Sequence, residues 1–341
     1  MDTLRTAVSV ASPDARHPLL MLATPMLAFF AGDQEDGLRG LRALGADPDP
    51  WVRAAGHATS GHLAMNGGHL EEAAADLARG YADFTAIGDR WGTIVALAGL
   101  AEVALARDDP DEAVRVLEEA RQLAAAGLHG NFADMMLIRL GQARARQGEF
   151  EAARDDLERG VRIAERIGER DDAASGYLEL AELARQLGEL DRARELVQHA
   201  VTVAEPNLRR PGASAIVATA YSKLGCLDEQ HGDLNSAAGW HAKAIGLVAG
   251  SDEVFMPSHP SVALVVEGFA ALAAARGQYR QAAELLGLAH TLHGFRDMAS
   301  AEAARAAATS SSALGAAGFD DAYARGRRLA RADVVRLTAG I

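Results

Sequence analysis

Small and large apolar residues recur along this chain at fixed distances from a repeated turn. The clearest copies lie in residues 132–205, where Gly148-Glu149-Phe150 and Gly188-Glu189-Leu190 are offset by 40 residues and followed by the same apolar spacing. Self-similarity at such a period indicates a stacked repeat. The turn falls at seven positions, separated by 36 to 45 residues: Gly32, Gly68, Asp108, Gly148, Gly188, Gly232 and Gly277.

Each turn is followed by a small residue five positions later and by a larger apolar residue nine positions later. A small side chain is needed where two helices approach closely, so this alternation predicts large residues of one helix packing against small residues of the next. A second set of mostly small residues precedes the turn by seven positions: Gly61, Ala101, Gly141, Ala181, Gly225 and Ala270. The larger residues are Leu41, Leu77, Leu117, Leu157, Val197 and Leu286, with His241 as the exception.

These spacings resemble the tetratricopeptide repeat, strongly from Gly61 to Ala289 and weakly in the first unit. The resemblance implies an all-α fold, a right-handed superhelical solenoid of antiparallel helix pairs with a period of about 40. We expect about seven pairs in residues 18–290, a disordered or linker segment in residues 1–17, and a helical cap in residues 291–341. Within the cap, Gly318 is expected to separate two helices. Residues 206–212 and 250–260 are expected to be irregular loops that lengthen the sixth and seventh units.

Charge and cysteine content narrow the class of partner. The formal net charge is −13 and the isoelectric point is near 5.3, so the surface should repel nucleic-acid phosphate and anionic membranes. Cys226 is the single cysteine, which excludes an internal disulfide and fits the reducing cytoplasm. The apolar run from Leu19 to Phe30 is too short to span a bilayer. We therefore expect a cytoplasmic protein that binds neither nucleic acid nor membrane directly.

The sequence carries no phosphate-binding loop and no paired-cysteine metal motif, so we expect no cofactor, no metal and no enzymatic activity. His290 and His293 lie three residues apart on one helix face and would form a metal site only with a further ligand such as Asp297. A packed histidine pair is the preferred interpretation. Cys226 lies in the middle of a predicted helix, where a buried apolar role is favoured over a nucleophilic one.

A polar stripe follows the first helix of each pair, which lines the concave face in tetratricopeptide arrays. Mixed acidic, amide and arginine side chains can bind a peptide backbone or a small polar ligand. An ordinary solvated face is the alternative, and both interpretations stay open at this stage. The Lys/Asn carboxylate clamp of chaperone-binding repeats is not matched. The candidate groove residues are His62, Asn66, Glu102, Gln142, Arg146, Glu182, Arg185, Gln186, Glu229 and Gln230.

The C-terminal region shows a second resemblance, carried by Ala282–Ala289, Ala303-Ala304-Arg305, Leu314-Gly315, Phe319 and Gly326-Arg327. It is similar to the end of large actinobacterial transcriptional activators of the antibiotic-regulatory-protein type, which place a bacterial activator domain and an ATPase ahead of their repeats. The resemblance implies a regulatory sensor or interaction domain. Its partner would be a protein or peptide, including other domains of the same regulator, or a small effector.

Neither the winged-helix DNA-binding domain nor the ATPase motif of those regulators occurs in this chain, so neither activity is expected from it. The alternative is a stand-alone scaffold that binds peptides and has no transcriptional role. A homo-oligomer also stays open, because an incompletely capped first or last repeat would offer an apolar face to a second copy.

Overall fold

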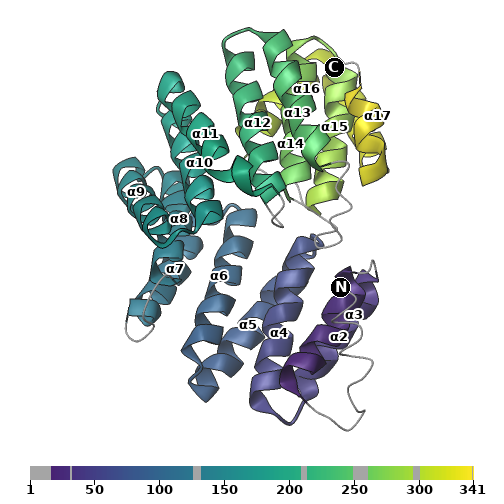
Figure 1. Cartoon of the computed structure of the whole chain (residues 1–341). Coiled ribbons are helices and arrows are strands. Elements are labelled where there is room, and N and C mark those ends of the chain that lie inside the picture. Colours follow the sequence, from purple (N-terminus) through teal and green to yellow (C-terminus); the bar gives the residue numbers. More distant parts are fainter. Residues whose placement is uncertain are drawn as a thin grey trace. The chain divides into compact units, whose positions relative to one another are not determined.

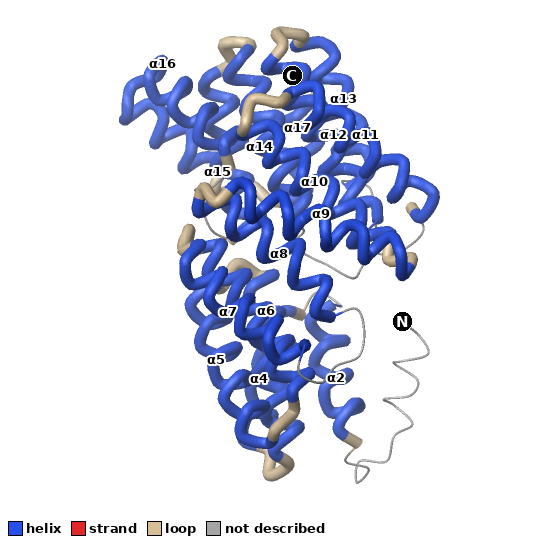
Figure 2. The backbone as a smooth tube through the Cα atoms, turned by 90° about the vertical axis from the view of Figure 1, so that its left-hand side faces the viewer, coloured by secondary structure: helices blue, strands red, loops and turns tan. Residues whose placement is uncertain are grey.

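The computed structural model describes residues 17–30, 33–125, 132–208, 213–248, 260–294, 300–339 and 341. Every regular element in these ranges is a helix, as Figure 2 shows. The first helices of the seven predicted pairs are α2 (Pro18–Phe30), α4 (Pro50–Asn66), α6 (Arg90–Ala106), α8 (Phe132–Gln147), α10 (Arg170–Gln186), α12 (Ala213–Gln230) and α14 (Pro260–Ala275). Their second helices are α3 (Gln34–Ala43), α5 (Leu70–Ile87), α7 (Pro110–Ala125), α9 (Phe150–Ile167), α11 (Leu190–Ala204), α13 (Leu234–Val248) and α15 (Tyr279–His293). The all-α repeat fold is therefore confirmed (Figure 1).

The helices form two compact units. Unit 1 contains α2 to α7 and the start of α8, up to Met136, and unit 2 contains the rest of α8 and all later helices. The N-terminal linker expected in residues 1–17 lies outside the described residues apart from His17, as do most of the two expected loops, and the boundary at residue 290 stays a prediction.

The repeated turn ends the first helix of each pair through a left-handed residue. Gly68, Asp108, Gly148, Gly188, Gly232 and Gly277 all have positive φ, between 57° and 84°, whereas Gly32 lies outside the described residues. At Gly188 the amide N–H donates to Arg185 O at 3.1 Å, and the Glu189 N–H donates to Ala184 O at 2.8 Å. This is a Schellman ending, which satisfies helix carbonyls that would otherwise have no partner. The six predicted turn positions that the structure describes are confirmed.

The predicted packing of large residues against small ones is also confirmed. Leu157 has no exposed surface, and a Cβ added to Gly141 would lie 2.5 Å from its Cγ. The same contact recurs in another repeat, where a Cβ on Gly61 would lie 2.5 Å from Leu77 Cγ. Because no real side chain tolerates that distance, the glycine sets how closely the two helices of a pair approach.

Two further helices follow the last pair, α16 (Ala301–Gly326) and α17 (Val334–Thr338). The expected break at Gly318 is wrong, because the kink in α16 lies at Gly315, with φ 71° and ψ 161°. This conformation is essentially restricted to glycine, and Gly315 adopts it while Gly318 stays helical. Beyond the kink, Phe319 and Ala322 are buried against the core of α14 and α15.

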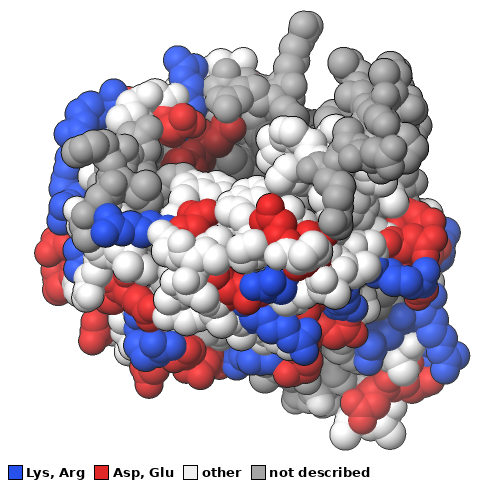
Figure 3. All heavy atoms as spheres, turned by 90° about the horizontal axis from the view of Figure 1, so that it is seen from below, with Lys and Arg blue, Asp and Glu red and all other residues white. Residues whose placement is uncertain are grey.

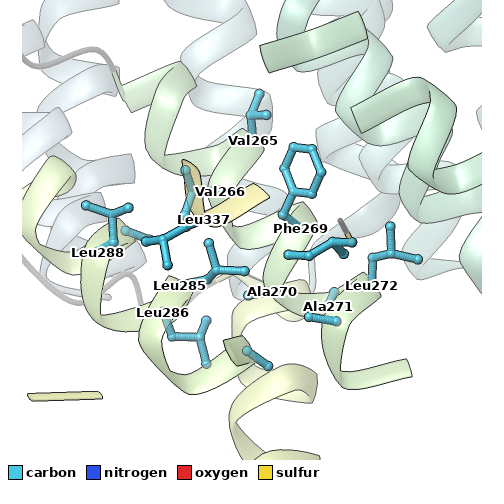
Figure 4. Packing of buried hydrophobic residues seen from close by; sticks show 14 of the residues in the cluster. Val265, Val266, Phe269, Ala270, Ala271, Leu272, Leu285, Leu286, Leu288 and Leu337 are labelled. Carbon is cyan, nitrogen blue, oxygen red and sulfur yellow. The ribbon is translucent and has the colours of Figure 1, made fainter. Parts of the chain in front are cut away.

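The C-terminal core joins α14, α15 and α17. Figure 4 shows Val266, Leu285 and Leu337 extending toward one another from these three helices. The cap is also tightly fitted, because a Cβ on Gly287 of α15 would lie 2.1 Å from Tyr323 O of α16. No helix among the described residues is long and apolar enough to cross a membrane.

Candidate partner-binding site

Glu182 on α10 is the centre of a group of charged side chains in unit 2. It accepts hydrogen bonds from Arg185 Nε at 3.1 Å and from Lys223 Nζ of α12, also at 3.1 Å. Gln186 Nε2 donates to the same carboxylate at 3.4 Å. The side chains of Glu182 and Lys223 are only 24% and 30% exposed, so water screens their attraction incompletely. Glu182 and Lys223 thereby connect two successive repeats.

Burial alone would raise the pKa of Glu182, but the Lys223 ammonium and the Arg185 guanidinium outweigh burial and hold that pKa well below its usual range. The charged form of Lys223 is stabilised in the same way. Burial would lower the pKa of Lys223, but the carboxylates of Glu182 and Glu179 raise it above its usual value. Both groups are therefore charged at neutral pH and hold each other in place.

The first turns of α16 complete this group. Arg305 NH2 donates to both carboxylate oxygens of Glu229 on α12, each at 3.1 Å. Glu302 Oε1 lies 4.0 Å from Arg185 Nε. Burial raises the pKa of Glu229, and the Arg305 charge opposes this rise only in part. We call the set Glu179, Glu182, Arg185, Lys223, Glu229, Glu302 and Arg305 the charged cluster.

A small cavity of about 60 Å³ adjoins the charged cluster, between α10, α12, α14 and the start of α16. Its lining combines the polar residues Thr219, Ser222, Ser300 and Glu267 and cluster side chains with apolar residues such as Val197 and Leu264. Cys226 also lines it, and burial raises the pKa of its thiol well above the usual value. A thiol in this state is not a nucleophile at neutral pH, so the cavity offers hydrogen bonding and charge rather than covalent chemistry.

Several of the predicted groove residues meet in the charged cluster. Glu182, Arg185 and Glu229 belong to it, and Gln186 contacts it. Gln142 of α8 reaches its edge, with Nε2 3.4 Å from Glu179 Oε1. The charge of half-buried Arg146 lowers the pKa of Glu179 in part, while burial raises it overall. Gln230 is exposed.

The remaining predicted groove residues lie in unit 1. His62 on α4 has Nε2 3.3 Å from Val95 O, and Glu102 is half-buried on α6. The side chain of Asn66 lies outside the described part of the chain. None of these three residues is a member of the charged cluster, which lies wholly in unit 2. Their role in binding stays a prediction.

Four members of the charged cluster, Glu179, Lys223, Glu302 and Arg305, are not among the groove residues predicted from the sequence. Glu179 and Lys223 lie nine residues before their turns, one helical turn ahead of the position six before the turn that was counted. Extending the stripe by one turn would have found both. Glu302 and Arg305 had no such signal, because no repeat periodicity relates α16 to α10 or α12.

The two histidines considered for a metal site make side-chain contacts in unit 2. His290 Nδ1 lies 2.7 Å from Tyr323 Oη, and His293 Nε2 lies 3.4 Å from Glu267 Oε1. Asp297, the third ligand considered, lies outside the described residues. These contacts fit a packed pair. Within the described ranges, no group of three or more His, Cys, Asp or Glu side chains is placed to hold a metal ion.

Opposite charges are interspersed on one face of the molecule. On the face shown in Figure 3, Lys and Arg side chains lie among Asp and Glu side chains. Some oppositely charged residues pair within a single helix, as Arg115 does with Glu112 and Arg192 with Glu195. Exposed pairs of this kind contribute little stability, typically below about 1 kcal/mol, which distinguishes them from the half-buried Glu182–Lys223 pair.

Comparisons with known proteins identify the family of the repeats in residues 132–205. The tetratricopeptide repeat family model matches residues 132–205, the segment in which the 40-residue offset is clearest. The chain therefore contains a tetratricopeptide-repeat domain. A search of curated proteins finds no match.

Three solved structures are similar in fold over most of this chain. A Rap protein complexed with competence and sporulation factor has a TM-score of 0.55 and 11% identity, covering 98% of this chain and 92% of that one. A signal-transduction ATPase with a tetratricopeptide repeat sensor from Pyrococcus horikoshii has a TM-score of 0.54 and 15% identity, covering 95% of this chain and 46% of that one. A tetratricopeptide repeat protein from Parabacteroides merdae has a TM-score of 0.53 and 13% identity, covering 86% and 98%. At these identities the similarity shows the fold alone.

Proposed function

We propose that the chain is a binding module whose charged cluster receives a peptide or a segment of a partner protein. The Glu182–Lys223 pair carries the proposal, because it places two fixed, half-buried charges on successive repeats beside a cavity. Charges ordered in advance cost less conformational entropy on binding and give specificity for complementary partners. Tetratricopeptide repeats suit protein–protein interaction. The Rap protein of similar fold is complexed with the competence and sporulation factor, which is consistent with this role.

A peptide library displayed on phage tests the proposal directly. Peptides selected on the wild-type chain should lose at least about tenfold in affinity on Lys223→Met and on Glu182→Gln, since each change leaves a charge without its partner. Arg192→Ala is the matched control, because Arg192 is exposed, pairs with Glu195 on its own helix and is not a member of the charged cluster. Equal binding to all four proteins, with unchanged helical content, would overturn the proposal.

We further propose that the module belongs to a cytoplasmic regulator of transcription and senses a partner or a small effector. The support is the sequence resemblance that ends at Gly326-Arg327. Its mechanism would be a shift in repeat curvature on binding, read by other domains of the same regulator or by a separate protein.

An immunoblot of native host extract distinguishes the regulator from its alternative. A band much larger than 35.8 kDa is expected for a sensor domain within a regulator. A band near that mass would favour a stand-alone scaffold that binds peptides. Small-angle scattering with and without a selected peptide tests the mechanism, and identical curves would exclude a change in curvature.

A further inference from the structure

The two halves of α16 are held in different ways. The half after Gly315 is anchored by buried Phe319 and Ala322 and by a close backbone crossing, where a Cβ on Gly326 would lie 1.9 Å from Glu284 O of α15. The half before Gly315, residues 301–314, is here called the docked segment. Because Gly315 has a conformation that interrupts the helix, the two halves need not move together.

The docked segment buries little apolar surface. Its contacts with the core of α14 and α15 come from Ala303, Ala306 and Ala307, which contribute one methyl group each (Figure 2 shows α16 beside these helices). Burial of a methyl group stabilises much less than burial of a phenylalanine side chain such as Phe319. Ser310 is also completely buried, and Glu302 and Arg305 form ion pairs with earlier helices.

These two residues contact two successive repeats. Glu302 and Arg305 are three residues apart, so they share one face of the helix. Glu302 faces Arg185 of α10, and Arg305 binds both oxygens of Glu229 on α12. The docked segment thus places the carboxylate of Glu302 opposite the guanidinium of Arg185. It places the guanidinium of Arg305 opposite the carboxylate of Glu229. Glu302 of this segment and Ser300, the N-cap residue just before it, also form part of the wall of the cavity.

We infer that the docked segment occupies the partner site, and that a partner binds by replacing it with a helix of its own carrying Glu and, three residues later, Arg. This inference rests on the proposed function and adds the chemistry of the partner and the order of events. The segment is part of the same chain, so its effective concentration is high, and a partner must present a better-matched helix or additional contacts. Removing the segment would open the cavity to the same partner.

Charge reversal tests whether the docked segment can be released. Arg305→Glu places two carboxylates together and should release the segment, seen as at least about tenfold faster hydrogen exchange of the amides of residues 303–314. The double variant Arg305→Glu with Glu229→Arg recreates the ion pair in the opposite sense and should restore slow exchange. The anchored half, residues 319–326, should exchange alike in all three proteins. Unchanged exchange in Arg305→Glu would overturn the inference.

A labelled synthetic peptide with the sequence of residues 300–314 tests occupancy. It should bind the Arg305→Glu chain, which keeps Arg185 and Glu229, at least about tenfold more tightly than the wild type, whose site is filled. A peptide with the two charges exchanged is the control and should bind neither chain. Equal weak binding to both chains would show that the segment has no site of its own and would overturn the inference.

Hydrogen exchange with a library-selected peptide separates this inference from the proposed function. Faster exchange of residues 303–314 on binding supports replacement. A selected peptide that binds through Glu182 and Lys223 while these amides stay protected would overturn replacement and leave the proposed function intact. Failure of every peptide to bind both the wild type and Arg305→Glu would overturn both.

Discussion

Glu179 and Glu182 lie one turn apart on α10, and their pKa values are shifted in opposite directions. Burial raises the pKa of Glu179, with only partial opposition from Lys223. Burial acts on half-buried Glu182 in the same direction, but direct hydrogen bonds from Lys223 and Arg185 hold its pKa far below the usual value. One lysine thus fixes the charge of the carboxylate that it touches and compensates the other incompletely.

The two glutamates should respond differently to replacement by glutamine. Glu182 has a lowered folded-state pKa, so its contribution to stability is present above about pH 4.5 and is lost as the pH falls. Glu182→Gln should therefore lower the free energy of unfolding at pH 7 by about 1–3 kcal/mol, and this loss should be smaller, though still present, at pH 3. Urea unfolding at both pH values checks this.

Glu179→Gln is the matched control for that prediction. A raised folded-state pKa means that the carboxylate of Glu179 lowers stability at pH 7, so its neutral replacement should leave the free energy of unfolding unchanged or increase it. An equal loss in both variants would contradict the assignment of opposite shifts.

His241 should make the fold acid-sensitive. It is fully buried, its Nδ1 lies 3.2 Å from Ser222 Oγ, and burial lowers its pKa from 6.5 to about 4. Between these two values the unfolded chain binds a proton that the folded chain does not, so stability falls as the pH decreases from 6.5 to 4. The contribution of this one group amounts to about 3 kcal/mol. His241→Leu should remove that part of the slope in urea titrations.

A leucine should fit at this position without strain. A Cβ on Gly225 would lie 2.7 Å from His241 Nε2, just as one on Gly61 would lie 2.5 Å from Leu77 Cγ. In both contacts the two residues have the same separation along the sequence, so His241 occupies the position that leucine holds in other repeats. An unchanged slope in His241→Leu would show that other groups cause the acid sensitivity.

Replacing Asp108, the turn residue that is not glycine, should make the fold more stable. Asp108 has φ 57° and is the only described non-glycine residue with positive φ. Left-handed backbone costs an L-residue roughly 1 kcal/mol, so Asp108→Gly should stabilise the fold by up to that amount. Gly188→Ala should destabilise it by about 1 kcal/mol through the backbone alone, since nothing lies within 4 Å of the added Cβ. Thermal unfolding of both variants, with opposite shifts expected, checks the pair.

The close approach of helices within a pair can be measured at Gly141. An added methyl group would meet Leu157, so Gly141→Ala should cost about 1–3 kcal/mol through overpacking. Gly239 on α13 is helical and exposed with open space around it, so Gly239→Ala should be neutral or slightly stabilising. A similar effect of both changes on urea unfolding would mean that helix propensity, rather than packing, decides the result.

The sequence predicted the repeats well because each depends on contacts that are close along the chain. Gly148 ends one helix, and Leu157 meets Gly141 sixteen residues away, so a fixed spacing encodes the whole pair. The kink at Gly315 was misplaced because two glycines three residues apart carry the same local signal. Only burial of Phe319 and Ala322 against the neighbouring helices distinguishes them.

In the proposed partner site, too, some features follow from local sequence spacing and others from the tertiary structure. The spacing from each turn, taken by itself, determined that Glu182, Arg185 and Glu229 share the stripe of first helices. The tertiary structure alone decided that Arg305 binds Glu229 across 76 residues and that Glu302 faces Arg185. Periodicity cannot encode these contacts, because α16 stands outside the repeat and is docked by its kink and by its packing on α15. The repeats follow from local spacing, whereas the occupied state of the charged cluster follows from where the last long helix folds back.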